Sequence, residues 1–169
     1  MIISVCALLF TIYSFWWMNW RKGRLNVSNF KHIGIYNSPQ KFYIELPLIF
    51  FNTGALPVVV ENLRLIFFDK DNSKHYLHFN ATRTGLGIDE GREFATPFSV
   101  NKGDSLKKYC EFQKNPSEIE LVPGKYKMSL EGKLYTKKKW ATLRNLEINI
   151  SPEKLDGLQM HYEFLEALE

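Results

Sequence analysis

The chain has 169 residues, of which 45% are hydrophobic, and a formal net charge of +4. This length fits one domain with an appendage, and the hydrophobic fraction excludes extended disorder. The basic residues lack the strong uniform bias of a nucleic-acid-binding protein, so we expect no nucleic-acid partner. The two cysteines, Cys6 and Cys110, lie in different parts of the chain, which excludes a disulfide scaffold.

Residues 2–20 form an uncharged apolar run. In a helix these residues would span about 28 Å, close to the hydrocarbon thickness of a bilayer. A cleaved signal peptide would need a basic stretch before the run and small residues after it, and the sequence has neither. Residues 1–24 are therefore predicted to be a transmembrane anchor with a basic flank, and the lipid bilayer is a predicted partner. Its predicted membrane-interface residues are Trp16, Trp17, Trp20, Arg21, Lys22 and Arg24.

The orientation of the anchor follows from its flanking charges. All three cations follow the apolar run, and Lys and Arg residues favour the cytoplasmic side of a membrane. The sequence thus predicts a single-pass membrane protein with its C-terminal domain in the cytoplasm. The alternative is an exported domain, which charges upstream of a different start codon would favour.

Residues 25–41 are expected to be a linker, and residues 42–150 a single all-β domain. Within this domain apolar and polar residues alternate with period two, which is typical of half-buried strands. About seven such stretches separated by turn signals predict a β-sandwich. The expected strands cover residues 42–50, 57–68, 75–81, 94–100, 106–112, 126–134 and 140–150.

Two features of the first strands predict irregular pairing. Pro47 lacks a backbone donor, so its strand is expected at a sheet edge or at a bulge. In the next strand Val58 and Val60 share one parity, whereas Leu63 and Leu65 share the other. An extra residue near Glu61-Asn62 would restore the alternation of faces.

Residues 151–169 are expected to form a short C-terminal amphipathic helix. Ser151 and Pro152 are typical of an N-cap and a first helical position. Gly157 weakens the helix by about 1 kcal/mol relative to Ala. The apolar stripe of this helix would consist of Leu155, Leu158, Tyr162, Leu165 and Leu168, and it is expected to dock on the domain or on another chain.

The stretch LPLIFFNTGALPVVVENLRLIFF at residues 46–68 resembles a pattern in uncharacterised bacterial single-pass membrane proteins. Residues 97–105 (PFSVNKGDS), residues 123–132 (PGKYKMSLEG) and Trp140 are similar as well. In that group a short N-terminal span precedes an immunoglobulin-like β-sandwich. The resemblance covers most of residues 42–150, and it implies a fold and membrane attachment without any site residues.

Several residues are of types that can carry chemistry. Residues 69–73 begin like a calcium loop but lack its glycine and bidentate Glu, so a hairpin turn is favoured. His75 and His78 would face opposite sides of a strand, which disfavours a shared metal. Cys110 is expected to pack inward as a small apolar group, and residues 85–87 to form a flexible connection. We therefore predict no catalytic, cofactor-binding or metal-binding residues.

Three consecutive lysines at residues 137–139 precede Trp140. This pattern allows a stacking platform for single-stranded nucleic acid, contact with anionic lipid headgroups, or a solvated hairpin tip with Trp140 in the core. The hairpin tip is favoured because charge runs are usually solvated.

The sequence predicts a membrane-anchored, non-enzymatic binding or assembly module with a protein partner of unknown identity. The alternative is a subunit of an oligomeric membrane complex whose transmembrane helices associate through Ser4, Thr11 and Ser14. A third possibility, an enzyme, would have to use Cys110 or the glycine-containing segment.

Overall fold

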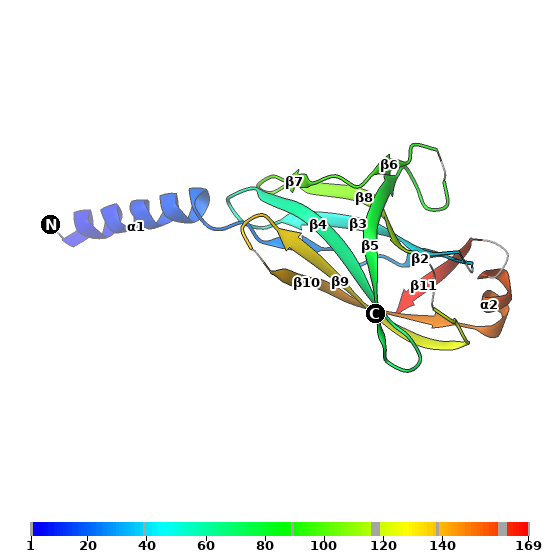
Figure 1. The fold of residues 1–169 in the computed structure, drawn as a ribbon. Helices are drawn as coiled ribbons and strands as arrows, with labels where there is room; N and C mark the ends of the chain where they lie inside the picture. Colours follow the sequence, from blue (N-terminus) through cyan, green and yellow to red (C-terminus); the bar gives the residue numbers. More distant parts are fainter. Residues whose placement is uncertain are drawn as a thin grey trace.

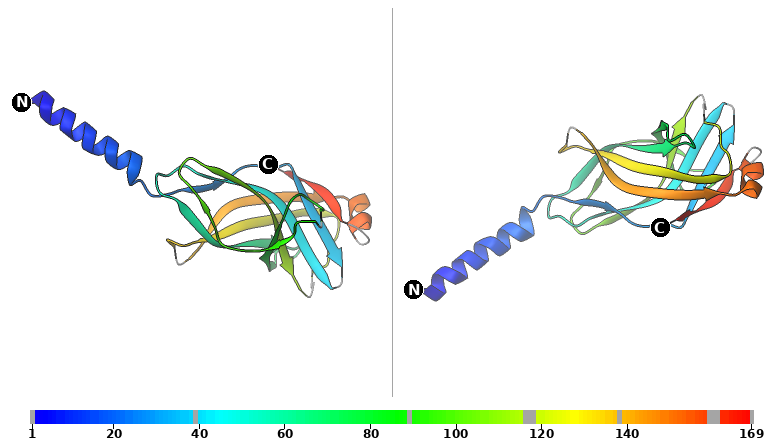
Figure 2. Two further views of the ribbon diagram at one scale, coloured as in Figure 1. Left: turned by 90° about the horizontal axis from the view of Figure 1, so that it is seen from above. Right: turned by 90° about the horizontal axis from the view of Figure 1, so that it is seen from below.

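The computed structural model describes residues 2–38, 40–88, 90–115, 119–137, 139–158 and 162–168. Helix α1 (Ile2–Asn19) projects from one end of a β-domain, and the short helix α2 (Pro152–Leu158) lies at the opposite end (Figures 1 and 2). The strands within the described residues are β1 (Leu25–Val27), β2 (His32–Ser38), β3 (Lys41–Asn52), β4 (Val58–Phe68), β5 (Lys74–Arg83), β6 (Glu93–Phe94), β7 (Phe98–Val100), β8 (Ser105–Lys114), β9 (Gly124–Leu134), β10 (Trp140–Ile150) and β11 (Glu163–Leu168).

The strands form a closed antiparallel barrel. Eight of the described strands follow one another in the order β5-β8-β3-β2-β11-β10-β9-β4, and pairing of β4 with β5 closes the ring. Strands β1, β6 and β7 pair at its margins with β3, β5 and β4. The predicted immunoglobulin-like sandwich is therefore wrong, because one sheet closes on itself instead of two sheets packing face to face.

The sandwich prediction failed because two barrel strands were missed. Each of the seven predicted stretches overlaps strands of the structure, but β2 lies in the predicted linker at residues 25–41, and β11 lies in the predicted C-terminal helix. These two strands pair with each other and join β3 to β10. Without them the predicted sheet cannot close.

Within the described residues of the C-terminal segment, Pro152–Leu158 form α2 and Glu163–Leu168 form β11, so the prediction of one helix over residues 151–169 is wrong. A Cβ atom added to Gly157 would lie 2.4 Å from Oε1 of Glu163. The absence of a side chain at Gly157 thus lets β11 pack close to α2. In this arrangement Leu158 and Leu165 are buried, while Leu168 is exposed.

The two predicted irregularities have different outcomes in the barrel. The pairing of β4 with β9 shifts register between Val60 and Asn62, which confirms the extra residue. Strand β3 is an internal strand that pairs with β8 in regular register through Pro47, so neither the edge position nor the bulge predicted from Pro47 is found. Its partners β2 and β1 pair with residues 41–45 and 50–52 of β3, and Pro47 lies between these stretches. The missing donor therefore falls where the ladder on that side is interrupted.

The barrel interior is filled with apolar and aromatic side chains. Phe67 stacks on Tyr126 with ring centroids 5.2 Å apart and meets Phe42 edge-on at 5.5 Å. Cys110 is completely buried in this core, as predicted, and burial raises the pKa of its thiol to about 12. A thiol with this pKa is an inert packing group. Cys110 is therefore no candidate nucleophile.

Candidate membrane interface and buried charge cluster

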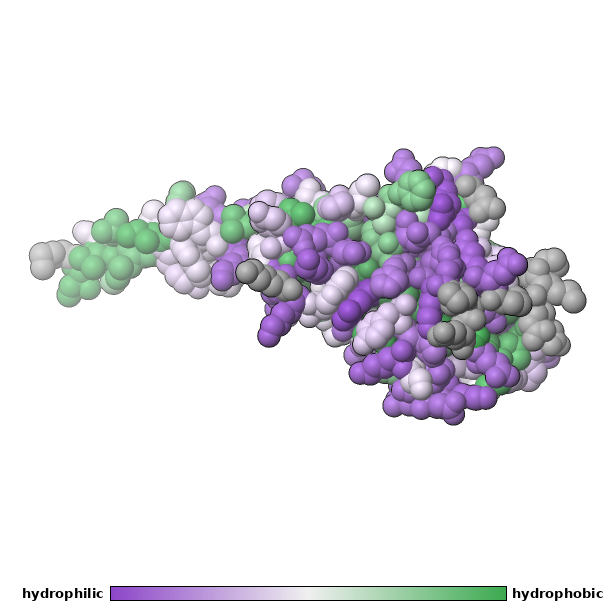
Figure 3. Space-filling model, viewed as in Figure 1, coloured by the Kyte–Doolittle hydropathy of each residue, from purple (hydrophilic) through white to green (hydrophobic). Residues whose placement is uncertain are grey.

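Helix α1 is long and apolar enough to cross a membrane, and it is the one such helix in the described part of the chain. None of its residues is buried against the barrel. Figure 3 shows its apolar surface beside the largely hydrophilic surface of the domain. Trp16 and Trp17 lie in its last turns, and Trp20 follows its end. The three predicted interface tryptophans therefore gather where the helix meets the barrel.

The segment after the helix is hydrogen-bonded to the barrel rim. Ala55 N donates to Arg21 O at 2.9 Å, and Thr53 N donates to Arg24 O at 3.1 Å. The Arg21 guanidinium donates to the Thr53 carbonyl and lies 4.7 Å from the Trp17 ring centroid. Of the predicted interface cations, Arg21 is thus held in place, while Lys22 and Arg24 are exposed.

Asn52, at the end of β3, is the centre of this junction and is only 2% exposed. Its Oδ1 accepts from Arg24 N at 3.1 Å and from Gly54 N at 2.9 Å. Its Nδ2 donates to Leu56 O at 2.8 Å and to Val100 O at 3.1 Å. One amide side chain therefore satisfies four backbone groups from three segments.

Two glycines permit the close approach of these segments. A Cβ atom added to Gly54 would lie 2.3 Å from Gly23 Cα and from Lys22 O. One added to Gly23 would lie 2.5 Å from Leu56 O. Any side chain at Gly23 or Gly54 would push residues 21–24 away from the rim.

A pocket of about 280 Å³ lies at this junction. Its lining combines Trp17, Met18 and Arg21 with residues 52–55 and the turn at Lys102 and Gly103. Lys102 Nζ reaches the end of α1, where it donates to the Met18 carbonyl. The sequence prediction missed Asn52 and Lys102, because only folding brings their turns to the helix.

A second polar centre lies on the outer wall of the barrel. Glu45 and Glu111 are direct cross-strand partners on β3 and β8, and both are completely buried. Two carboxylates at paired positions repel each other, so a cation is needed between them. Arg83, at the end of β5, supplies it. Its Nη2 donates to Glu111 Oε2 at 2.7 Å, and its Nε lies 2.8 Å from Glu45 Oε1.

Arg92 and Asn80 complete the environment of Glu111. Arg92 Nη2 donates to Glu111 Oε1 at 3.0 Å, and Asn80 Nδ2 donates to the same oxygen at 2.9 Å. Burial of Glu111 raises its pKa, but the hydrogen bonds from Arg92, Asn80 and Arg83 outweigh that effect and hold the pKa at about 2. Glu111 is therefore ionised at neutral pH. We call Glu45, Glu111, Arg83, Arg92 and Asn80 the charge cluster.

The charge cluster holds a connecting segment against the barrel wall. This segment comprises residues 84–88 and 90–92, which we call the 84–92 segment. Gly87 N donates to Glu45 Oε2 at 2.9 Å, and Arg83 Nη1 donates to Ile88 O at 3.2 Å. Residues 85–87 were predicted to be a flexible connection. Instead, Gly87 and Ile88 in the middle of the segment and Arg92 at its end are bonded to buried charges.

Tyr162, just before β11, seals the same cluster from the other side. Its hydroxyl donates to Glu45 Oε2 at 2.6 Å. Burial and this contact with Glu45 raise the pKa of Tyr162. A Cβ atom at Gly34 would lie 1.5 Å from the Tyr162 hydroxyl oxygen, and one at Gly87 would lie 3.0 Å from its ring. Gly34 and Gly87 thus leave the space that the tyrosine occupies.

Strand register explains where the charge cluster sits. A row of outward-facing residues, one from each of six neighbouring strands, runs across the barrel wall. Each residue of the row is the cross-strand partner of the next. Small residues flank the two carboxylates, and exposed phenylalanines end the row. In order, these residues are Phe164, Gly34, Glu45, Glu111, Ala81 and Phe94. The small residues make the hollow in which the 84–92 segment and Tyr162 cover the charges.

This arrangement is chemically self-contained. Two carboxylates face two guanidinium groups: Glu111 accepts hydrogen bonds at both oxygens, and Glu45 accepts two at Oε2 while its Oε1 forms an ion pair with Arg83. Such compensation keeps buried charges tolerable and holds the segments that carry them in one geometry. The cluster therefore fastens surface segments to the barrel wall. In the sequence, Glu45 and Glu111 look like ordinary outward strand residues, and only the apolar run around Glu45 hints at burial.

The other residues weighed from the sequence fall in separate places. Residues 69–73 form the expected hairpin turn, in which Asp69 Oδ1 accepts from Ser73 N at 2.8 Å. The Asp69 pKa is lowered by its hydrogen bond with His75. Among the residues that the structure describes, no three His, Cys, Asp or Glu side chains are placed to hold a metal ion.

Trp140 is on the outer face of the barrel, not in the core as the favoured interpretation had it. It pairs with Lys133 on β9, and the Arg64 guanidinium lies 4.3 Å from the Trp140 ring centroid. Arg64 Nε also donates to Glu131 Oε2 at 2.6 Å. Trp140 therefore stacks on a paired surface cation. Of the three neighbouring lysines, Lys138 lies outside the described residues.

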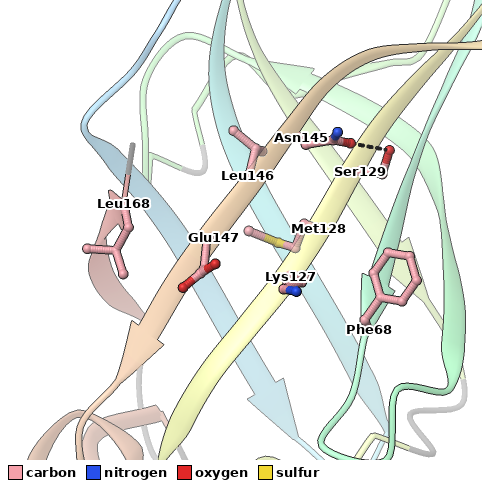
Figure 4. Close-up of a pocket in the computed structure, with 8 residues that line it drawn as sticks. All are labelled: Phe68, Lys127, Met128, Ser129, Asn145, Leu146, Glu147 and Leu168. Carbon is pink, nitrogen blue, oxygen red and sulfur yellow. Dashed lines mark hydrogen bonds between the residues drawn. The ribbon is translucent and has the colours of Figure 1, made fainter.

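A shallow hollow of about 450 Å³ lies over β9 and β10 (Figure 4). Phe68 and Leu168 flank it, and Ser129 Oγ donates across its floor to Asn145 Oδ1 at 3.0 Å. Lys127 and Glu147 are paired residues of the same two strands. This hollow has the mixed character of an ordinary outward strand surface.

No protein-family model matches the chain, and no curated protein matches its sequence. Among solved structures, the chain is similar to the crystal structure of a Bordetella pertussis protein provisionally named ApaA. The two are 12% identical with a TM-score of 0.38, and the match covers 80% of this chain and 98% of that one. We therefore interpret the site from the chain's own residues.

Proposed function

We propose that the protein is a single-pass membrane protein whose barrel acts as a non-enzymatic binding or assembly module held at the bilayer surface. The observation that carries this proposal is the junction between α1 and the barrel. An apolar helix of 18 residues leads into residues 21–24, which are hydrogen-bonded to the rim around Asn52. A flexible tether would not need this connection. The junction would hold the barrel in a fixed pose relative to the membrane.

The proposed binding face lies around the charge cluster. Ile88 of the 84–92 segment and Phe164 of β11 are each 47% exposed, and Phe94 of β6 is 77% exposed. Gly87 lies beside Phe164, so the segment and β11 form one continuous surface. Exposed aromatic and aliphatic side chains on a rigid support are typical anchors for protein partners. The charge cluster supplies the rigid support.

The orientation follows from the cations at the junction. Arg21, Lys22 and Arg24 favour the cytoplasmic side of a membrane. Moving each of them across is opposed by about 2.3 kcal/mol per 100 mV of membrane potential. We therefore place the barrel in the cytoplasm.

Membrane attachment can be tested with the full chain in liposomes. The wild-type chain should float with the liposomes after alkaline washing, whereas a chain lacking residues 2–18 should stay in the soluble fraction with its β-sheet circular dichroism intact. That deletion keeps residues 21–24 at the rim. A wild-type chain that stays soluble without detergent would refute the anchor. Digestion of a C-terminal tag from outside intact cells would refute the cytoplasmic placement.

The binding role can be tested by photocrosslinking in intact cells. A photoreactive residue at Ile88 should give a discrete crosslinked product, and one at Lys70 on the distant β4–β5 turn should not. The same probe at Thr11 distinguishes the alternative, because crosslinked dimers of this chain through α1 would indicate a complex built by its transmembrane helices. No product at Ile88, Phe94 or Phe164 would exclude this face.

A further inference from the structure

We propose that the junction pocket binds the phosphate of a membrane phospholipid headgroup. This inference rests on the proposed function, because it requires α1 to span a bilayer. The pocket is formed jointly by the end of α1, the β3–β4 turn and the β7–β8 turn. It therefore exists only when the helix is docked on the rim.

The charge of the pocket fits an anion. Arg21 and Lys102 are the ionisable residues among those that line it, and both are cationic. Arg21 is positioned by its contacts with the Trp17 ring and the Thr53 carbonyl. A guanidinium has five N–H donors, so other donors of Arg21 remain for a phosphate oxygen. A positioned guanidinium is well suited to phosphate because two parallel hydrogen bonds can form.

Lys102 contributes a second cation from a distant part of the chain. Its Nζ donates one hydrogen bond to the Met18 carbonyl, close to the end of α1. An ammonium group has three donors, so two remain. Its charge also offsets the negative end of the helix dipole, which would otherwise repel an anion. The turn at residues 101–104 thus delivers a cation to the place where the helix leaves the predicted bilayer.

The depth and size of the pocket point to a lipid. Trp17 belongs to the aromatic group that marks the headgroup level, so the pocket lies at the level of lipid phosphates. Its volume of about 280 Å³ is just below the range of about 300–1,000 Å³ that small-molecule pockets span, which suits one headgroup. Trp17 and Met18 give one wall an apolar character that suits the glycerol and upper acyl chain. A free phosphate ion would leave this wall without a contact.

Native mass spectrometry of the full chain in mild detergent tests this proposal. The probe is phosphatidylglycerol, titrated against wild type, Lys102→Gln and Arg21→Gln. Each substitution should weaken retention of the first lipid about fivefold, because one cation near a membrane surface contributes about 1 kcal/mol. Lys102→Arg should bind like wild type. Lys70→Gln, which removes an equally exposed lysine from a distant turn, should also bind like wild type.

The outcomes separate the proposal from its premise. Thermal unfolding of each variant identifies any that fail to fold, and the glutamine variant at the other cation then carries the test. Equal lipid retention by wild type and by the folded glutamine variants would overturn the site while leaving the anchor intact. Failure of the wild type to float with liposomes would refute the anchor itself. If millimolar inorganic phosphate displaces the lipid completely, the pocket is a general anion site, and the lipid assignment is wrong.

Discussion

At the α1 end of the barrel, Asn52 fastens residues 21–24 with neutral hydrogen bonds. On the outer wall, Glu45, Arg83 and Glu111 fasten the 84–92 segment with charges. Both groups are buried, and both bind segments that are remote in sequence. An amide satisfies backbone donors and acceptors at little desolvation cost, whereas each buried charge depends on its partners. The junction should therefore be insensitive to pH, and the charge cluster should be sensitive both to pH and to the loss of any one member.

Replacement of Arg83 by Met should have the largest effect. It would leave the paired carboxylates of Glu45 and Glu111 buried without the cation between them. Removing one partner of a buried ion pair typically costs about 3–5 kcal/mol. The free energy of unfolding of the full chain in mild detergent, measured with urea, should fall by this amount.

The matched control for this variant is Lys133→Met, which breaks an exposed ion pair with Glu61. Exposed pairs contribute about 0–1 kcal/mol, so its effect should be small. Adding Glu111→Gln to Arg83→Met should restore part of the loss. Equal losses in the free energy of unfolding for the Arg83 and Lys133 variants would show that the charge cluster stabilises the barrel no more than an exposed ion pair does.

Acidification should destabilise the charge cluster selectively. The pKa of Glu111 is about 2 in the folded chain, against an ordinary value of 4.5. A carboxyl with a lowered pKa contributes stability above its unfolded pKa, and that contribution is lost as the pH falls from 4.5 to below 2. The loss should be of the order of 3 kcal/mol. Urea unfolding at several pH values should show this decline in wild type and a flatter profile in Glu111→Gln.

Replacement of Asn52 by Ala should destabilise the junction by about 2 kcal/mol, because backbone groups at the rim would lose their partners. This loss should be the same at pH 4 and pH 7, in contrast to the behaviour of the charge cluster. Asn149→Ala, at an exposed position, is the control. A loss that grows on acidification would contradict the neutral character of the junction.

The sequence predicted those features of the molecule that depend on residues adjacent in the chain. The tryptophans and cations of residues 16–24 are contiguous, and their pattern indicated an interface. The alternation in residues 42–150 predicted strands, including the extra residue near Asn62. Leu158 at the end of α2, Tyr162 just before β11 and Leu165 in β11 satisfied a helical spacing, although Tyr162 and Leu165 lie at opposite parity of an extended segment. The local pattern could not decide between a helix and a strand here. The strand forms because β11 pairs with β2, a contact between distant parts of the chain.

The closure of the barrel and the burial of charge depend on contacts between distant segments. Glu45 and Glu111 have the parity of surface residues, and they become buried only when the 84–92 segment and Tyr162 cover them. Glycines near residue 87 indicated flexibility, but two of them serve close packing against Tyr162 and Thr84. Asn52 and Lys102 are ordinary turn residues until the barrel brings their turns to α1. Apart from the apolar run around Glu45, these features have no local signature in the sequence.

Removing the Tyr162 hydroxyl should give the smallest effect. Tyr162→Phe loses one hydrogen bond to a buried carboxylate, and Glu45 keeps Arg83 and Gly87 N as partners. The expected loss is about 1–2 kcal/mol at neutral pH. Tyr76→Phe, at an exposed ring, is the control and should change stability little.

The pH profile identifies the origin of this loss. Because the folded-state pKa of Tyr162 is raised above 10, its contribution is complete below pH 10 and declines as the pH rises further. Tyr162→Phe should remove that part of the alkaline decline, while Tyr76→Phe should keep it. An unchanged alkaline profile in Tyr162→Phe would show that the hydroxyl is not bonded to Glu45, and the seal over the charge cluster would then rest on packing of the Tyr162 ring against Gly34, Gly87, Tyr43 and Phe164.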